Sequence, residues 1–141
     1  MIAKQISVFL ENKSGRLTEV TSLLGEAGIN LTAFSIAENS EFGILRMIVS
    51  DPEKAYKILK DAHFAAKQTD VLCLSCPNTP GALATALKLL SDKGVFFEYM
   101  YAFANGETAN VIIRPDDIES SIKILQDAKL QLLAASDLYR L

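Results

Sequence analysis

Two loops in the sequence carry residue types that could bind a small anion. Both read N-x-x-G-x-L, and they comprise Asn12, Lys13, Ser14, Gly15, Arg16 and Leu17 in the first loop and Asn78, Thr79, Pro80, Gly81, Ala82 and Leu83 in the second. Glycine allows close approach to the backbone, and the unpaired N–H groups of a helix N-terminus favour a carboxylate. The alternative is that Asn and Gly only form a tight turn between a strand and a helix.

The two loops are equivalent parts of an internal repeat. At an offset of 66 residues, the Asn, Gly and Leu positions of the first loop fall on those of the second without any insertion. Near the end of each copy, KILKDA at residues 57–62 matches KILQDA at residues 123–128. Such a repeat indicates modules of one architecture. We therefore expect two fused domains, residues 1–70 and 71–141, that fold as a unit because each alone is small.

Hydrophobic periodicity predicts the same order of elements in each copy. In the first copy the expected segments are a strand at 6–10, a helix at 15–27, hairpin strands at 29–37 and 42–49, a second helix from residue 50 and a closing strand at 66–69. Ser50 and Glu53 have the spacing of a capping box for the second helix. In the second copy, Thr79 is the expected N-cap of the first helix and Pro80 suits its first turn.

The order β-α-β-β-α-β is the split pattern of ferredoxin-like domains. The sequence therefore predicts an α+β protein of two ferredoxin-like modules in tandem, each an antiparallel sheet with helices on one face. No linker separates the copies, and the closing strand of the first is expected to continue into the opening strand of the second at Val71.

The sheet face without helices carries aromatic residues in the second copy. Alternate residues of a strand point to the same face, so Tyr99, Tyr101 and Phe103 share this face if Met100 points toward the helices. Three aromatic side chains make a poor solvent surface, so we expect a homodimer through this face. The alternative is a register shift of one residue, which would place the same aromatics in the core.

Composition excludes several classes of function. The net charge of −3 and the pI near 5.1 argue against nucleic acid, including an RNA-binding role in which the aromatic face stacks bases. The sequence contains no run of 18 apolar residues and no segment typical of a signal peptide, so we expect a cytoplasmic protein without membrane contact.

Cysteine and histidine give little support for metal or redox chemistry. Cys73 and Cys76 have C-x-x-C spacing, but they lie in an alternating run in which residues three apart point to opposite faces. His63 is the only histidine, and it is expected at a helix end. We expect no catalytic residues, no metal and no cofactor.

Taken together, these features resemble the ACT domain over essentially the full chain, twice. They are the N-x-x-G-x-L loop after a strand, a leucine-rich helix ending at Gly28-Ile29-Asn30 or Gly94-Val95-Phe96, and then a hairpin and a second helix. ACT domains are regulatory modules of ferredoxin-like fold that bind amino acids, often beside enzymes of amino-acid metabolism. The resemblance implies a ligand held at the interface between paired domains by the strand-to-helix loop of one and the start of the second strand of the other. It thus implies ligand contacts from both loops and from Asn30.

The sequence departs from this family in two places. The acidic residue that often opens the loop is Asn in both copies, and Phe96 replaces the polar Asn30 in the second copy. If each site needs a polar residue at that point, only Asn30 with the loop at residues 78–83 forms a complete site. Lys13 and Arg16 are candidate partners of a ligand carboxylate, or solvated charges at a helix start.

Three classes of function remain open at this point. The first is a non-catalytic amino-acid sensor that regulates an enzyme in trans. The second is an assembly or interaction protein without a small-molecule ligand. The third is an acylphosphatase-like hydrolase, which would need an arginine-bearing phosphate loop; Arg16 lies in one loop, but Ala82 takes its place in the other.

Overall fold

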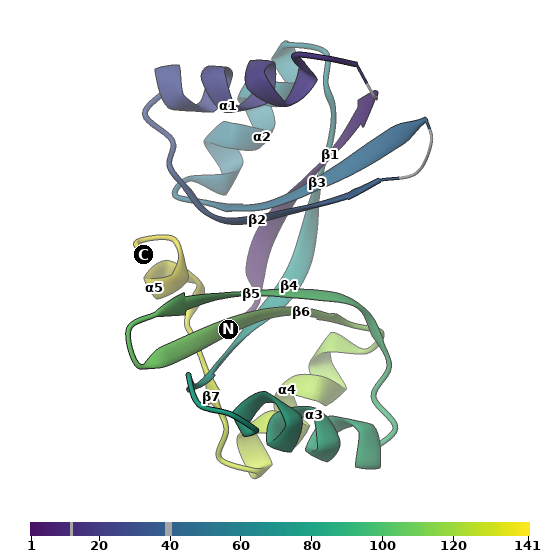
Figure 1. The fold of residues 1–141 in the computed structure, drawn as a ribbon, viewed down its shortest axis with the longest axis vertical. Coiled ribbons are helices and arrows are strands. Elements are labelled where there is room, and N and C mark those ends of the chain that lie inside the picture. Colours follow the sequence, from purple (N-terminus) through teal and green to yellow (C-terminus); the bar gives the residue numbers. More distant parts are fainter. Residues whose placement is uncertain (12, 39–40) are drawn as a thin grey trace. The chain divides into compact units, whose positions relative to one another are not determined.

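A computed structural model describes residues 1–11, 13–38 and 41–141 (Figure 1). The chain divides into two compact units. The first unit comprises Lys4–Thr69 with Leu138–Leu141, and the second unit comprises Asp70–Asp137 with Met1–Ala3. Both have the predicted β-α-β-β-α-β order, so the tandem ferredoxin-like α+β fold is confirmed.

In the first unit, two helices cover one face of an antiparallel sheet with strand order β2-β3-β1-β4 (Figure 1). Its elements are β1 (Ala3–Glu11), α1 (Arg16–Glu26), β2 (Leu31–Glu38), β3 (Phe42–Val49), α2 (Pro52–Asp61) and the first part of β4 (Ala65–Pro77). Residues four apart on each helix face the sheet: Val20 and Leu24 on α1, Ala55 and Leu59 on α2. They pack against Ile6, Val8, Leu10, Leu45 and Met47 of the strands.

The second unit repeats this arrangement with strand order β4-β6-β5. Its elements are the rest of β4, α3 (Ala82–Asp92), β5 (Phe97–Asn105), β6 (Thr108–Pro115), α4 (Ile118–Asp127), the two-residue strand β7 (Gln131–Leu132) that pairs with β4, and the short α5 (Ala135–Leu138). Helices α3 and α4 lie on one face of the sheet (Figure 1). The uninterrupted strand β4 confirms that the two copies join without a linker.

Two of the predicted helix caps are wrong. The N-cap of α2 is Asp51, whose Oδ1 accepts from the Lys54 N–H at 3.2 Å. The Ser50 hydroxyl is engaged elsewhere, because its Oγ accepts from the Asn30 N–H at 2.9 Å. In the second copy, the N-cap of α3 is Gly81 rather than Thr79, whose carbonyl instead accepts from the Ala82 N–H at 3.2 Å.

The register of β5 places the aromatic stripe on the face without helices, as predicted. Tyr101 pairs with Ile112, whereas Met100 pairs with Ile113, which belongs to the core beneath the helices. The alternative of a one-residue register shift is therefore wrong. Tyr99, Tyr101 and Phe103 are half-buried rather than exposed.

Candidate functional site

The two N-x-x-G-x-L loops have the same backbone geometry. Gly15 (φ 89°) and Gly81 (φ 85°) are the N-caps of α1 and α3, and both are in the left-handed region that favours glycine. Neither provides a side-chain cap, whereas α2 and α4 are capped by Asp51 and Asp117. A Cβ built at either glycine meets no atom within 4 Å, so the backbone there is open to approach.

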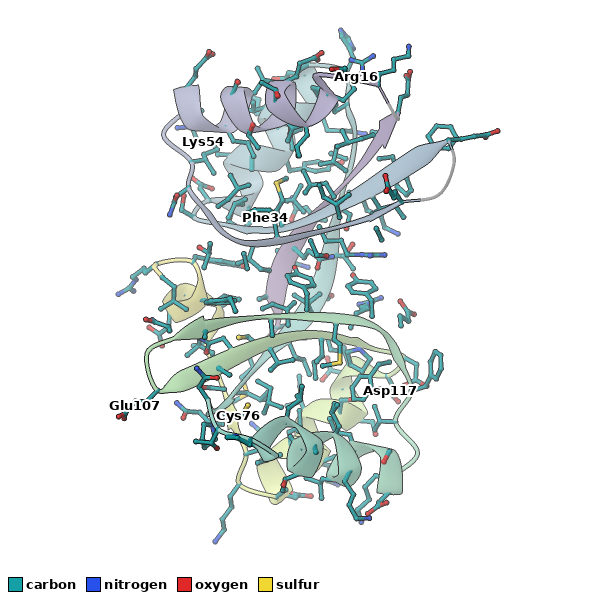
Figure 2. The ribbon with its side chains drawn as sticks, viewed as in Figure 1. Arg16, Phe34, Lys54, Cys76, Glu107 and Asp117 are labelled. Carbon is teal, nitrogen blue, oxygen red and sulfur yellow. The ribbon has the colours of Figure 1, made fainter. Side chains whose placement is uncertain are left out.

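The first loop places two cations among carboxylates at the start of α1. Lys13 Nζ lies 2.8 Å from Glu11 Oε2, and Arg16 lies 3.9 Å from Glu11 and 3.3 Å from Glu19 (Figure 2 labels Arg16). The hydrogen bond and charge of Lys13, with a smaller effect of Arg16, lower the pKa of Glu11. Lys13, Glu11 and Glu19 are exposed and Arg16 is partly exposed, so these ion pairs are weak.

A pocket of about 430 Å³ lies against this loop, and we call it the loop pocket. Its lining includes Lys13, Ser14, Arg16 and Leu17 of the predicted site together with Leu10, Glu11, Ile36, Glu38 and Gly43. The sheet register explains the grouping, because Gly43 of β3 pairs with both Leu10 of β1 and Glu38 of β2. Asn12, the first residue of the predicted site, lies outside the described residues.

The second loop is tied to the β5–β6 turn. The Asn78 N–H donates to the Glu107 carbonyl at 2.8 Å, and Asn78 Nδ2 donates to the Gly106 carbonyl at 3.4 Å. Thr79, Pro80, Gly81 and Leu83 are exposed, and Ala82 is half-buried. The asparagine therefore has a structural role here, and the exposed remainder of the loop carries no side-chain charge.

Asn30 lies far from the first loop within its own unit. It precedes β2, whose first residue Leu31 pairs with Val49, whereas Glu11 beside the loop pairs with Phe42 at the other end of β3. Seven residues of strand separate these ends, about 23 Å at ~3.3 Å per residue. A small ligand cannot touch both positions in one unit.

Cysteine and histidine lie as the sequence predicted. Cys76 belongs to the core beneath the helices, and Cys73 is buried outside that core, on the opposite face of β4 (Figure 2 labels Cys76). Burial raises the pKa of the Cys73 thiol to about 12. His63 follows the end of α2 with φ 66° and is exposed. In the described part of the chain, no three His, Cys, Asp or Glu side chains gather to hold a metal ion.

A second pocket, which the sequence analysis did not predict, lies at the same end of the first unit. We call this cavity of about 360 Å³ the phenylalanine pocket, and it is lined by Phe9, Leu10, Glu11, Arg16, Phe42, Ala62, His63, Phe64 and Ala65. It shares Leu10, Glu11 and Arg16 with the loop pocket. A comparison of the two copies could have indicated it, because Ser75, Thr108 and Leu130 stand in the second copy where the three phenylalanines stand in the first.

Over residues 1–11, 13–38 and 41–141, no helix is both long and apolar enough to span a membrane. No curated protein matches the sequence.

Comparison with solved structures identifies relatives of this fold. A protein of Bacteroides thetaiotaomicron is 64% identical, with a TM-score of 0.97, and the match covers 100% of this chain and 98% of that one. The regulatory subunits of aspartate kinase from Thermus thermophilus and Thermus flavus are 16% and 19% identical, with TM-scores of 0.64 and 0.61, and each match covers 89% of this chain and 91% of the subunit. At such identity they show a shared fold. The sequence model of the ACT domain pair matches residues 1–141, and the chain therefore belongs to the family of ACT domain pairs, which are regulatory modules.

Proposed function

We propose that this protein is a non-catalytic, cytoplasmic amino-acid sensor whose ligand binds at the strand-to-helix loops. The observation that carries the proposal is the contrast among its four main helices. Two of them, α2 and α4, begin at an aspartate that caps the helix, whereas α1 and α3 begin at a left-handed glycine with no side-chain cap. This contrast recurs in both copies at the N-x-x-G-x-L motif, where an external carboxylate would find backbone N–H donors.

The first loop supplies groups of both signs for a zwitterionic ligand. Lys13 and Arg16 offer donors for the α-carboxylate, and Arg16 keeps spare donors because a guanidinium has five N–H groups. Glu11 and Glu38 line the same pocket and offer acceptors for the α-ammonium. The second loop, with Thr79, Pro80 and Ala82, would bind through its backbone and hydroxyl groups.

The membership of the chain in the ACT family supports a ligand held between paired domains. Asn30 is about 23 Å from the loop of its own unit, so any ligand contact that it makes belongs to the loop of another ACT domain. Residues 1–70 and 71–141 are the two domains that we propose for this pairing.

We further propose that the sensor acts on an enzyme in a separate chain. The Thermus proteins of the same fold are regulatory subunits of aspartate kinase, and each match covers 91% of the subunit. An ACT pair of this size can therefore serve as a regulatory chain.

A homodimer through the helix-free face is part of the proposal. Tyr99, Tyr101 and Phe103 form one aromatic stripe there, and each is half-buried in the single chain, so the surface left for a partner is the exposed part of this stripe. Sedimentation at micromolar concentration should give twice the chain mass for the wild type, and a monomer would contradict the dimer. A purely assembling protein is the second candidate function, favoured by the exposed Phe34 and Ile36 on the edge strand β2.

Thermal unfolding in the presence of each of the twenty amino acids tests the sensor. A ligand at ~100 times its Kd stabilises the native state by about 2.7 kcal/mol, which corresponds to about 5–10 °C in Tm for a protein near this size. We expect a shift of this kind for one amino acid or a chemically related few. No shift for any of them, with a single cooperative transition, would exclude the sensor and favour assembly.

Arg16→Ala then tests the site, since it introduces the residue that the second copy carries at Ala82. A charged hydrogen bond contributes about 1.5–3 kcal/mol, so Kd should rise about tenfold or more. Lys88→Ala is the matched control, because Lys88 forms an exposed ion pair with Asp92 on α3, away from both loops. Equal Kd values for the two variants would show that the ligand binds away from Arg16.

A further inference from the structure

We propose that the phenylalanine pocket receives the side chain of an aromatic amino acid, and that this pocket sets the ligand class of the sensor. The inference rests on the proposed function, because it assumes that an amino acid binds at the first loop. It adds the class of the ligand's side chain, which the N-x-x-G-x-L motif does not specify.

Two walls of the pocket come from exposed rings on neighbouring strands. Phe9 of β1 pairs with Ile44 of β3, and Glu11 pairs with Phe42, so the two phenylalanines are diagonal neighbours. Both lie on the sheet face away from the helices, since Val8 and Leu10 point into the core. Diagonal positions are within reach of aromatic side chains. Phe9 is 50% exposed and Phe42 is 48% exposed, so both rings have surface to offer a ligand.

The third wall is the turn that follows α2. Phe64 packs partly into the core, and its N–H donates to the Leu59 carbonyl at 2.9 Å. The preceding His63 is held in the left-handed region (φ 66°), with its N–H bonded to the Lys60 carbonyl at 3.0 Å. The closed turn fixes the ring of Phe64 relative to the strands, and the pocket is therefore preformed on this side.

The phenylalanine pocket and the loop pocket meet at two charged residues. Glu11 and Arg16 line both, and they lie 3.9 Å apart. An amino acid with its carboxylate at Arg16 and its ammonium at Glu11 can direct its side chain between the phenylalanine rings. The volume of about 360 Å³ is at the small end of the ~300–1,000 Å³ typical of ligand pockets, and it leaves room for a side chain of aromatic size. Rings favour offset-stacked and edge-to-face contacts with one another, which aliphatic chains cannot make.

The second copy shows that the scaffold does not require these residues. At the same offset of 66 residues, Phe9, Phe42 and Phe64 correspond to Ser75, Thr108 and Leu130, while Arg16 corresponds to Ala82. The strand pairing is equivalent, because Cys76 pairs with Ala109 as Leu10 pairs with Gly43. Leu130 keeps the packing role of Phe64 in the second copy, whereas Ser75, Thr108 and Ala82 do not replace the rings of Phe9 and Phe42 or the charge of Arg16. Since the fold forms without Phe9, Phe42 and Arg16 at this place, their presence in the first copy favours a role in binding.

Isothermal titration of the full chain with each of the twenty L-amino acids tests the inference. We expect binding of phenylalanine, tyrosine or tryptophan, with leucine, valine and lysine at least about tenfold weaker. The variants are Phe9→Ser, Phe42→Thr and the double variant, which carry the residues of the second copy. Each single change should weaken aromatic binding about tenfold, and the double change about a hundredfold. Phe34→Ser is the matched control, because Phe34 (labelled in Figure 2) is 61% exposed in the same unit. It is not among the residues that line either pocket.

The outcomes separate this inference from the proposed function. Aromatic binding that the pocket variants lose and Phe34→Ser retains supports the inference. Tight binding of an aliphatic or charged amino acid, unchanged in the pocket variants, overturns the aromatic pocket while the sensor function stands. Aromatic binding that survives the double change also overturns the pocket. If no amino acid binds the folded protein, the proposed function fails and the inference fails with it. The single variants remain as tests if the double variant does not fold.

Discussion

Replacing two glycines of the same helix by alanine should change stability in opposite directions. Gly15 is the N-cap of α1 with φ 89°, whereas Gly25 lies near the end of that helix and is not in the left-handed region. A Cβ would meet no atom within 4 Å at either position, so steric clashes do not contribute. The two variants therefore isolate the effect of backbone conformation at the candidate site.

The sizes of the two effects follow from this geometry. A left-handed conformation costs an L-residue about 1–2 kcal/mol, and the lower entropy of the unfolded chain offsets about 0.4–1 kcal/mol of this. Gly15→Ala should thus destabilise the protein by about 1 kcal/mol. Gly25→Ala should stabilise it by about 0.5–1 kcal/mol, because alanine is the better helix former. The difference of about 2 kcal/mol corresponds to about 4–8 °C in Tm.

Urea denaturation followed by circular dichroism measures both variants without ligand. We expect the midpoint of Gly15→Ala below that of the wild type and that of Gly25→Ala above it, with unchanged m values. If Gly15→Ala were as stable as Gly25→Ala, the backbone at the N-cap would not be held in the left-handed conformation. The argument for an open, glycine-dependent anion site at the start of α1 would then be wrong.

Two further predictions concern the helix caps and the buried thiol. Asp51→Ala and Asp117→Ala should each lower the free energy of unfolding by about 1 kcal/mol in urea denaturation, since each removes an equivalent side-chain cap; a negligible effect at both would contradict the cap assignment. Burial raises the pKa of the Cys73 thiol from its ordinary 9.0 in the unfolded chain to about 12 in the folded protein. Below pH 9 the thiol is protonated in both the folded and the unfolded state. As the pH rises from 9 to 12, only the unfolded state loses the proton, so the stability conferred by burying the neutral thiol is lost. Wild type should therefore lose more stability than Cys73→Ala between pH 8.5 and 10.5, and Cys73 should react with a thiol reagent at pH 8 only after unfolding.

The fold could be predicted from the sequence because its signals are local and repeated. Residues such as Val20, Leu24, Ala55 and Leu59 recur at helical spacing, and the same positions at an offset of 66 residues are buried in the second unit as Ala86, Leu90, Ser121 and Leu125. The hairpins appear as two apolar stretches around a short polar turn. Two copies of one pattern support each other, so a weak signal in one is strengthened by the other.

Helix starts were harder to predict because several residues compete for the same donors. Ser50 has capping-box spacing with Glu53, yet Asp51 is also present and takes the role at α2. The serine hydroxyl has a different partner, the N–H of Asn30, which is 20 residues away in the sequence. Similarly, left-handed Gly81 takes the N-cap position two residues after Thr79, and the Thr79 carbonyl accepts from the Ala82 N–H, the first of α3. Tertiary partners of this kind leave no local pattern.

The two candidate pockets also depend on contacts distant in sequence. Phe9 and Phe42 are 33 positions apart and become neighbours only through the register of β1 on β3. His63 and Phe64 reach the same place because α2 ends there in a closed turn. The sequence could identify the loop at residues 12–17, which is contiguous, but not the pocket that several elements form beside it.

Under the proposed function, a separation of two roles after duplication would explain the chemical difference between the copies. In the first loop, Lys13 and Arg16 keep their charges near solvent, in exchangeable ion pairs. In the second, Asn78 is tied to the neighbouring turn through its N–H and Nδ2, and no charged side chain follows it in the motif. If both copies bound ligand alike, selection on one chemistry would keep similar residues in both loops. The observed difference is the one expected if the first copy recognises the ligand's charges and side chain while the second offers backbone donors on the same scaffold.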